Sequence, residues 1–476
     1  MTPSLTTSLR PRRAAWLRDD HLSFLWAGMV WALIVLMIVP EGFDYQTLAG
    51  GHASQQTGGF VSRIVWLGLL ILSLAVICWR ASLAWLLLRM LNPYLLLLAG
   101  LAVLSIAWSI DPSLTVRRLI RIVTIMLVCI GFVLAAWHAR RYQNVVRPIL
   151  TAVLVGSIGF GLAFPSLAIH QESAPELAGA WRGLANHKNG LGGLASITLI
   201  LWFHAGLTRQ ARLLPALAGG AVAAICLVLS RSSTSMAASA FVLVFLLITL
   251  GSPRALRRYV PHLVALLVVT LLVYALAILD LVPGLSLLLA PITALTDKDA
   301  SFTGRTQIWD LVAEHMQMRP LLGSGYGAYW TAGAVPGTES FVVRMGNFYP
   351  GSAHNGYLEI ANDLGFVGLA CLLAYLVKHV KQALQLLGTD RPQGTLYLAL
   401  FFQQAIANLS ESHWFSVLSV NFILMTLATT ALARGMIEYR FRAVFGEPPR
   451  AAGVDGHRTA PPPPERSFVR VQRDGA

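Results

Sequence analysis

Long apolar runs recur along almost the whole chain, and they limit its fold more than any other feature of the sequence. Each run has about 17 to 22 residues, enough for a helix to cross the roughly 30 Å hydrocarbon core of a bilayer. With 56% hydrophobic and only 12% charged residues, the 476-residue chain lies outside the range of ordinary soluble domains. The sequence therefore predicts an all-α polytopic membrane protein.

About twelve transmembrane spans are expected. They cover residues 22–40, 62–79, 92–108, 118–137, 147–168, 189–206, 213–229, 236–250, 262–281, 356–377, 395–410 and 414–433. The polar breaks near 80–92 and 229–236 are only a few residues long, so ten or fourteen spans remain open. The expected domains are a basic N-terminus (1–21), nine spans (22–281), a long loop (282–355), three spans (356–435) and a largely disordered tail (436–476).

Arginine and lysine residues fall in alternate loops, and this alternation predicts the orientation because cytoplasmic loops retain positive charge. If the N-terminus is cytoplasmic, so are the tail and the loops that contain Arg80, Arg140, Arg209, Arg254 and Lys378. The long loop then lies outside the cytoplasm, together with Asp111, Arg231 and Glu411. The net charge of +14 is accounted for by this asymmetry and by lipid headgroup contact, so nucleic acid is not the expected partner.

The four cysteines lie singly within predicted spans. Packing roles are expected for them, without a disulfide or a zinc site. They are Cys78, Cys129, Cys226 and Cys371.

The long loop is predicted to contain a helix from about Thr303 to Met318 with one apolar face, lying on the membrane surface. Arg305 falls in its first turn, where the exposed amide groups disfavour a cation. An anion attracted to both would relieve that conflict, which favours an anion site. The alternative is a surface arginine paired with Asp310 or with a lipid phosphate.

The segment PLLGSGYGAYW follows, with glycines at 323, 325 and 327 that permit tight turns. Its aromatic residues Tyr326, Tyr329 and Trp330 suit the face of a sugar. An interfacial aromatic belt explains them equally well.

The segment SAHNGYLEI begins the tenth span, with Ser352 as the expected helix cap and His354 in the first turn. The positive end of the helix dipole would favour the neutral imidazole that a general base needs. A polar anchor at the membrane interface is the plainer reading of this histidine.

Further cations on the outer side oppose the general trend of positive charge inside. Arg117 and Arg121 lie one helical turn apart and could reach a single diphosphate, while Arg182, Lys188 and Arg231 occur in other outer loops. Contact with outer-leaflet phosphates is the alternative for each residue.

Asp297 and Asp299 form a D-x-D pattern, by which many soluble glycosyltransferases hold a metal with a nucleotide. We favour a solvated turn, because no nucleotide-binding strand and helix pattern lies nearby. No metal or other cofactor is therefore expected. Chelator-sensitive activity restored by manganese would reverse this interpretation.

Several of these motifs together resemble the O-antigen ligase and polymerase superfamily of the Wzy and WaaL type. The resemblance rests on GRTQIW with Arg305 and Trp309, then PLLGSGYG, then HNGYLEIANDLGFVGL. NHKNGLGGLA, with His187 and Asn189, and LSRSSTS resemble the exopolysaccharide-polymerase branch. The resemblance covers roughly residues 95–435.

The resemblance implies a GT-C-like, metal-independent glycosyltransferase that uses an undecaprenyl-diphosphate-linked oligosaccharide at the periplasmic face of the bacterial inner membrane. Arginines would stabilise the departing diphosphate and a histidine would activate the acceptor hydroxyl, with inversion at the anomeric carbon. The implied catalytic residues are Arg305 and His354. The implied diphosphate contacts are Arg182, Lys188, Arg231, Arg117 and Arg121, and the orienting residues are His187, Asn189, Asn355 and Tyr326.

Polymerase is preferred over ligase by analogy with the HKN segment. A ligase would transfer the glycan to lipid A core, and a protein O-oligosaccharyltransferase to a protein hydroxyl. The alternative from another class is a lipid or polysaccharide transporter, for which an internal repeat would be expected. A structural assembly subunit would leave the outer cations unexplained. Further partners implied by the resemblance are a chain-length regulator and a flippase.

Overall fold

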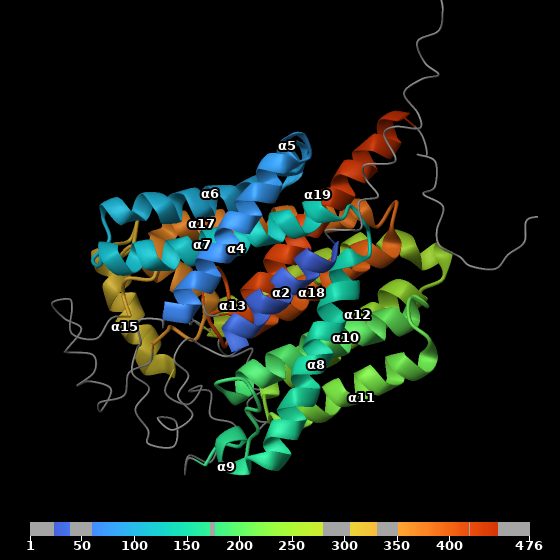
Figure 1. Ribbon diagram of the computed structural model, residues 1–476, viewed down its shortest axis with the longest axis horizontal. Coiled ribbons are helices and arrows are strands. Elements are labelled where there is room, and N and C mark those ends of the chain that lie inside the picture. The colour runs from blue at the N-terminus through green and yellow to red at the C-terminus, as the bar shows by residue number, and fades with distance from the viewer. Residues whose placement is uncertain are drawn as a thin grey trace, which may run out of the picture.

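The computed structural model describes residues 23–38, 60–171, 177–278, 305–330, 351–417 and 419–445 (Figure 1). Within these ranges the chain is helical, and the extended pairing found there is a single bridge between Ile169 and Trp181. The predicted all-α class is confirmed. Asp297, Asp299 and most of the long loop lie outside the described residues.

In chain order, the helices of the described residues are α2 (Ser23–Ile38), α4 (Phe60–Trp79), α5 (Ala81–Met90), α6 (Pro93–Leu104), η2 (Ser105–Ala107), α7 (Pro112–Ala135), α8 (Arg141–Ala163), α9 (Pro165–Ala168), α10 (Lys188–Leu207), α11 (Leu213–Leu229), α12 (Ser233–Gly251), η3 (Arg254–Tyr259), α13 (Val260–Ile278), α15 (Arg305–Met318), α17 (Gly356–Leu386), α18 (Arg391–Ala407) and α19 (Val420–Phe445).

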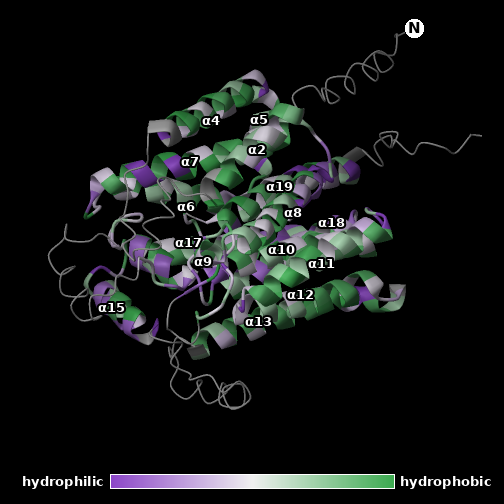
Figure 2. Cartoon of the chain, turned by 60° about the horizontal axis from the view of Figure 1, so that its bottom comes forward, coloured by the Kyte–Doolittle hydropathy of each residue, from purple (hydrophilic) through white to green (hydrophobic). Residues whose placement is uncertain are grey.

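Each of the twelve predicted apolar segments overlaps a helix of the described structure. Seven of the described helices are long and apolar enough to cross a membrane, and an eighth span results if α4 and α5, bent by 98°, count as one. The helices α2, α6 and α11 are apolar but shorter. Figure 2 shows hydrophobic residues along most of the bundle and a mixture of hydrophilic and hydrophobic ones on α15. A multi-pass membrane protein is thus supported, and the count of twelve stays a prediction.

The helix α18 is not among these seven, although the sequence predicts a span there. Nearly all of its side chains are buried among neighbouring helices, including the polar Gln403 and Gln404. A helix enclosed by protein does not need an apolar surface toward lipid. Its composition therefore reflects its place inside the bundle.

The loops gather at the two ends of the bundle, which can be followed along α10. Near the end of α10, His204 Nε2 donates to the carbonyl oxygen of Pro392 at 2.9 Å, and Gln210 accepts a hydrogen bond from Gln143 at 3.3 Å. At its start, Asn189 contacts Glu411. The contacts near the end of α10 join loops that are predicted to be cytoplasmic. The contact at its start joins loops that are predicted to lie outside the cytoplasm. Their grouping matches the alternation of charge, while the orientation itself stays a prediction.

The glycine-rich segment after α15 is docked onto a break in α17. Gly365 has φ +68°, so the helix is interrupted and the carbonyl groups of Asn362 and Asp363 accept bonds from Ser324 and Gly325 at 3.1 and 2.9 Å. The glycines at 323, 325 and 327 all have positive φ, as the predicted tight turns require. The segment is therefore held against α17 along its backbone.

Gly365→Ala is expected to destabilise the protein. A Cβ atom there would lie 2.1 Å from the carbonyl oxygen of Leu321, and the residue would be held at positive φ. The free energy of unfolding should fall by at least about 1–3 kcal/mol, measured by thermal unfolding in detergent. Gly159→Ala is the matched control, because nothing lies within 4 Å of the added atom. Equal stability of the two variants would contradict the docking.

Candidate active site

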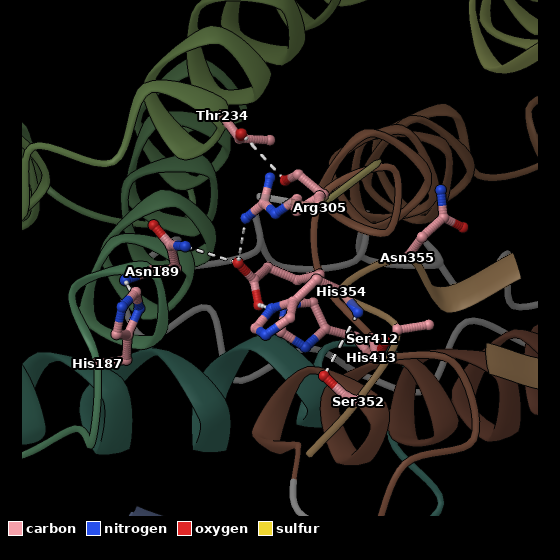
Figure 3. Close-up of polar contacts among 12 residues, drawn as sticks. His187, Asn189, Thr234, Arg305, Ser352, His354, Asn355, Ser412 and His413 are labelled. Atoms are coloured by element: carbon pink, nitrogen blue, oxygen red, sulfur yellow. Dashed lines mark hydrogen bonds and ion pairs between the residues drawn. The ribbon is translucent and has the colours of Figure 1, made fainter. Parts of the chain in front are cut away.

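The carboxylate of Glu411, in the loop between α18 and α19, contacts side chains from three other segments, and Figure 3 shows the three side chains, Asn189, Arg305 and His354, pointing toward one another. Its Oε1 atom accepts from Arg305 Nη2 at 3.2 Å and from Asn189 Nδ2 at 2.6 Å. Its Oε2 atom lies 3.4 Å from His354 Nδ1. The side chains of Arg305 and Glu411 are each 19% exposed and that of His354 is 31% exposed, so the cluster is partly shielded but open to water.

The position of Arg305 follows from the packing of α15. The apolar face of this helix joins a buried cluster with Trp330 and Ala353. Trp309 Nε1 also donates to the carbonyl oxygen of Ala353 at 3.0 Å. The helix ends at Met318 as predicted, and its apolar face packs against other parts of the protein, while its place on the membrane surface stays a prediction.

The start of α17 differs from the expectation in one respect. Asn355 is the helix cap, with its side-chain oxygen accepting from the amides of Tyr357 and Leu358 at 3.0 and 3.1 Å. Ser352 instead accepts from the amide of His354 at 3.4 Å. The prediction that Ser352 caps the helix was wrong, because Asn355 directly precedes the helix and already satisfies those amides.

His354 therefore lies before the helix and not in its first turn. It has φ +47°, a conformation that costs free energy for any residue other than glycine. Such strain persists only where the surrounding contacts impose it, and it is frequent at functional sites.

Asn408, directly after α18, holds the Glu411 loop beside the start of α17. Its side-chain oxygen accepts from the amides of His413 and Trp414 at 2.9 and 2.8 Å. Its backbone oxygen accepts from the amide of Gly356 at 2.9 Å. A side chain at Gly356 would collide with the Asn408 amide, so glycine is needed there.

The charges in the cluster are fixed by burial and by mutual attraction. Burial would raise the pKa of Glu411, but the hydrogen bond and charge of His354, with the charges of Arg305 and His413, lower it to about 2. Burial lowers the pKa of His187 to about 4, although the charge of Glu411 opposes the change. Near neutral pH the site thus contains a carboxylate and a neutral His187.

His187 and Asn189 stand together at the start of α10. The Nδ1 atom of His187 accepts from the amide of Asn189 at 3.3 Å and caps the helix. Its ring also meets that of His170 edge-on, at 5.1 Å between centroids. The sequence-predicted residues that the structure brings close to Glu411 are thus Arg305, His354, Asn189 and His187, while Asn355 supports them.

Among the described residues, three of the other predicted cations contact the loop before α10 and not Glu411. Arg182 is buried and its Nε donates to the carbonyl oxygen of Leu167 at 2.7 Å. Arg231, at φ +49°, donates to the carbonyl oxygen of Ala178 at 2.8 Å. Both therefore order the loop before α10, and the amide of Lys188 joins the same loop by donating to His170 at 3.2 Å.

Arg117 and Arg121 do not contact Glu411 within the described part of the chain. Arg117 is exposed at the start of α7, and the guanidinium of Arg121 lies over the ring of Trp66 in α4, 5.9 Å from its centroid. Their shared reach toward one diphosphate stays a prediction.

The aromatic residues after α15 serve as internal packing. Tyr326 and Trp330 are buried, and the hydroxyl of Tyr326 donates to the carbonyl oxygen of Phe415 at 2.6 Å. Burial raises the pKa of Tyr326 well above its usual value, and the charge of Asp363 acts in the same direction. Tyr326 thus joins the glycine segment to the Glu411 loop, whereas Trp330 packs in the cluster of α15, and neither ring presents an open face to a sugar.

Sequence reasoning assigned no role to Glu411. The available signal was a single acidic residue between two apolar segments at the end of the bundle where the other candidates lie. Within the described residues no group of three or more histidine, cysteine or acidic side chains is arranged to hold a metal ion.

The arrangement can perform acid–base chemistry near an anion. A carboxylate only accepts hydrogen bonds, so His354 donates through Nδ1 and its Nε2 lone pair remains available as a base. Arg305 contributes a permanent positive charge with several donors at the start of a helix. A hydroxyl to be deprotonated and an anionic leaving group would both find partners here.

The helical membrane fold and this polar cluster at one end define a polytopic membrane protein with a candidate active site. Residues 218–373 match the O-antigen ligase family, a region that includes Arg305 and His354 and ends before Glu411. The chain is also 29% identical, over 326 residues, to the exopolysaccharide production protein ExoQ of Rhizobium meliloti (strain 1021). The aligned region covers 65% of this chain and 70% of the relative. The resemblance predicted from the motifs is confirmed.

Glu411→Gln should change the dependence of stability on pH. The pKa of Glu411 is lowered from 4.5 to about 2, so its ionised form stabilises the fold by about 3 kcal/mol above pH 4.5. That contribution is lost as the pH falls from 4.5 toward 2. Thermal unfolding across this range should show the loss in the parent protein and not in Glu411→Gln.

Glu438→Gln is the matched control, because it removes a carboxylate that is 37% exposed from an ion pair within one helix, in which the partner Arg434 is buried. Its pH dependence should follow that of the parent protein. An unchanged profile in Glu411→Gln would contradict the ion pairing of Glu411.

Proposed function

We propose that this chain is a Wzy-type polysaccharide polymerase. It carries out glycan transfer of the O-antigen ligase type, moving a growing glycan from undecaprenyl diphosphate to a hydroxyl of a lipid-linked repeat unit. The observation that carries the proposal is the meeting of Arg305 and His354 at Glu411, because a cation for a leaving diphosphate and a base for a hydroxyl lie side by side. The match to the O-antigen ligase family supports it.

In the proposed reaction His354 Nε2 accepts the proton of the acceptor hydroxyl as that oxygen bonds to the anomeric carbon. The bond between this carbon and the phosphate oxygen breaks on the opposite side, which inverts the configuration. The electron pair leaves with the diphosphate, and Arg305 stabilises the charge. Glu411 holds the ring of His354 and stabilises the imidazolium that forms. No metal is required for these steps.

Residues around the cluster receive supporting roles in this scheme. His187 and Asn189 orient Glu411, Asn355 fixes the start of α17, and Tyr326 joins the two loops at the site. The diphosphate contacts proposed beyond Arg305 are Arg182, Lys188, Arg231, Arg117 and Arg121. Of these, Lys188 is the first residue of α10, and Arg182 and Arg231 lie in loops next to it.

The choice of polymerase over ligase rests on the relative. That protein takes part in exopolysaccharide production by its name, and its similarity extends over about two thirds of this chain. A ligase acting on lipid A core is the second candidate, because the matching family carries that name. Protein O-oligosaccharyltransferase activity and transport are the remaining alternatives.

The proposal includes the cellular setting. The protein would lie in the bacterial inner membrane with both termini in the cytoplasm and the Glu411 cluster in the periplasm. Its substrates would be undecaprenyl-diphosphate-linked oligosaccharide and a glycan acceptor in the outer leaflet. A flippase would supply the donor, and a chain-length regulator would limit the product.

Reconstitution with lipid-linked repeat units alone distinguishes polymerase from ligase. A polymerase uses the same molecule as donor and acceptor, so a ladder of longer glycans should appear on gel electrophoresis. A ladder that forms only after addition of a core lipid would instead indicate a ligase. Product that forms only on a hydroxyl-bearing protein would indicate a protein O-oligosaccharyltransferase.

His354→Gln and Arg305→Gln should each lower kcat without changing the amount of protein in the membrane. Loss of a general base typically costs 10²–10⁴-fold and loss of one charge-stabilising donor about 10²–10³-fold. Turnover should be measured with purified donor, and abundance by immunoblotting.

His262→Gln and Arg212→Gln are the matched controls. His262 is exposed at the start of α13, and Arg212 precedes α11 at the end of the bundle away from Glu411. Both should retain normal turnover. Normal turnover in His354→Gln and Arg305→Gln as well would show that neither residue has its proposed role.

A further inference from the structure

Glu359, in the first turn of α17, binds three separate segments near the cluster. Its Oε1 atom accepts from Trp330 Nε1 at 2.8 Å. Its Oε2 atom accepts from the amide of Ala353 at 2.6 Å and from the hydroxyl of Ser412 at 3.1 Å. One side chain on a helix thus gathers the segment after α15, the segment before α17 and the loop after α18.

The two contacts of Oε2 have a consequence for the neighbouring residues. Ala353 directly precedes His354, and Ser412 directly follows Glu411. The Oε2 atom of Glu359 therefore links the residue before His354 to the residue after Glu411. The side chains of His354 and Glu411 themselves lie 3.4 Å apart, between His354 Nδ1 and Glu411 Oε2.

The peptide groups of Ala353 are bound from two sides. Its amide is bound by Glu359, and its carbonyl oxygen accepts from Trp309 of α15 at 3.0 Å. Ala353 therefore connects α15, the helix that begins with Arg305, to the segment that holds His354 at positive φ. A strained residue of this kind needs such external support.

Glu359 itself lies in the first turn of a capped helix. Glu359 lies one turn after the cap Asn355, whose side chain accepts two amides of α17. Loops held on a regular helix keep their geometry better than loops held on each other.

We propose that Glu359 is a positioning residue that sets the distance between His354 and Glu411 through Ala353 and Ser412. Its effect on turnover rests on the function proposed above, whereas its effect on geometry does not. A reacting group displaced by about 1 Å can cost 10²-fold in rate, so a lost link should act on catalysis more than on binding.

Glu359→Gln and Ser412→Ala test the catalytic part. The second variant removes one hydroxyl and leaves the other contacts of Glu359 in place, so it remains informative if Glu359→Gln folds poorly. Each should lower kcat about ten- to hundredfold while KM for the lipid-linked donor stays within about twofold. The double variant should be no slower than Glu359→Gln alone, because both changes break the same link.

Asp363→Asn is the matched control. Asp363 lies one turn further along α17 and accepts from the amide of Gly327 at 2.7 Å, a contact to the glycine segment and to neither His354 nor Glu411. It should retain the kcat of the folded parent protein. Equal losses of kcat in all three variants, in proportion to a lowered melting temperature, would overturn the positioning role.

A readout independent of activity tests the geometric part. His354→Cys and Glu411→Cys are combined in a chain whose four native cysteines are replaced by alanine, and dibromobimane, which fluoresces on bridging two thiols, is added. Introducing Glu359→Gln or Ser412→Ala should slow bridging at least about fivefold, and Asp363→Asn should not. Unchanged bridging would overturn the proposal. Slower bridging in a protein whose parent form has no transferase activity would support the positioning and reject the proposed function.

Discussion

The candidate site depends on one carboxylate placed between two nitrogen-based groups. Arg305 and His354 both belong to the long loop, the first at the start of α15 and the second just before α17, and Glu411 is the acid that contacts both. Without it, a partly shielded guanidinium would lie close to an imidazole that would gain a positive charge in the proposed reaction. The low pKa of Glu411, about 2, reflects the strength of this attraction. The loop between α18 and α19 is therefore as much a part of the site as the two residues that the motifs indicate.

Much of the fold could be predicted because the governing interactions are local. Apolar runs long enough to span a bilayer mark helices wherever they occur, and each of the twelve predicted segments overlaps one. The helix that begins at Arg305 and ends at Met318 followed from one apolar face, and the tight turns followed from three glycines. The bend between α4 and α5 was missed, since a polar break of a few residues does not specify an angle of 98°.

The site could be predicted only in part because its contacts are distant in sequence. Arg305 and His354 were found from their motifs, but Glu411 lies 106 residues after the first and 57 after the second. No periodicity connects such positions. The assignment of the cap to Ser352 failed because two capping residues occur within four positions and only tertiary contacts choose Asn355. The aromatic residues looked suited to a sugar, yet Tyr326 and Trp330 fill the space between loops.

The enclosed, polar character of α18 has a consequence for how the chain enters the membrane. A segment whose buried residues include Gln403 and Gln404 gains less by partitioning into lipid alone than a wholly apolar one does. Its predecessor α17 has 31 residues and is apolar enough to cross by itself. We therefore expect biogenesis to proceed with α17 and α18 leaving the translocon as a hairpin. The loop that carries Glu411 would then take its final position only after α19 has packed against the other helices.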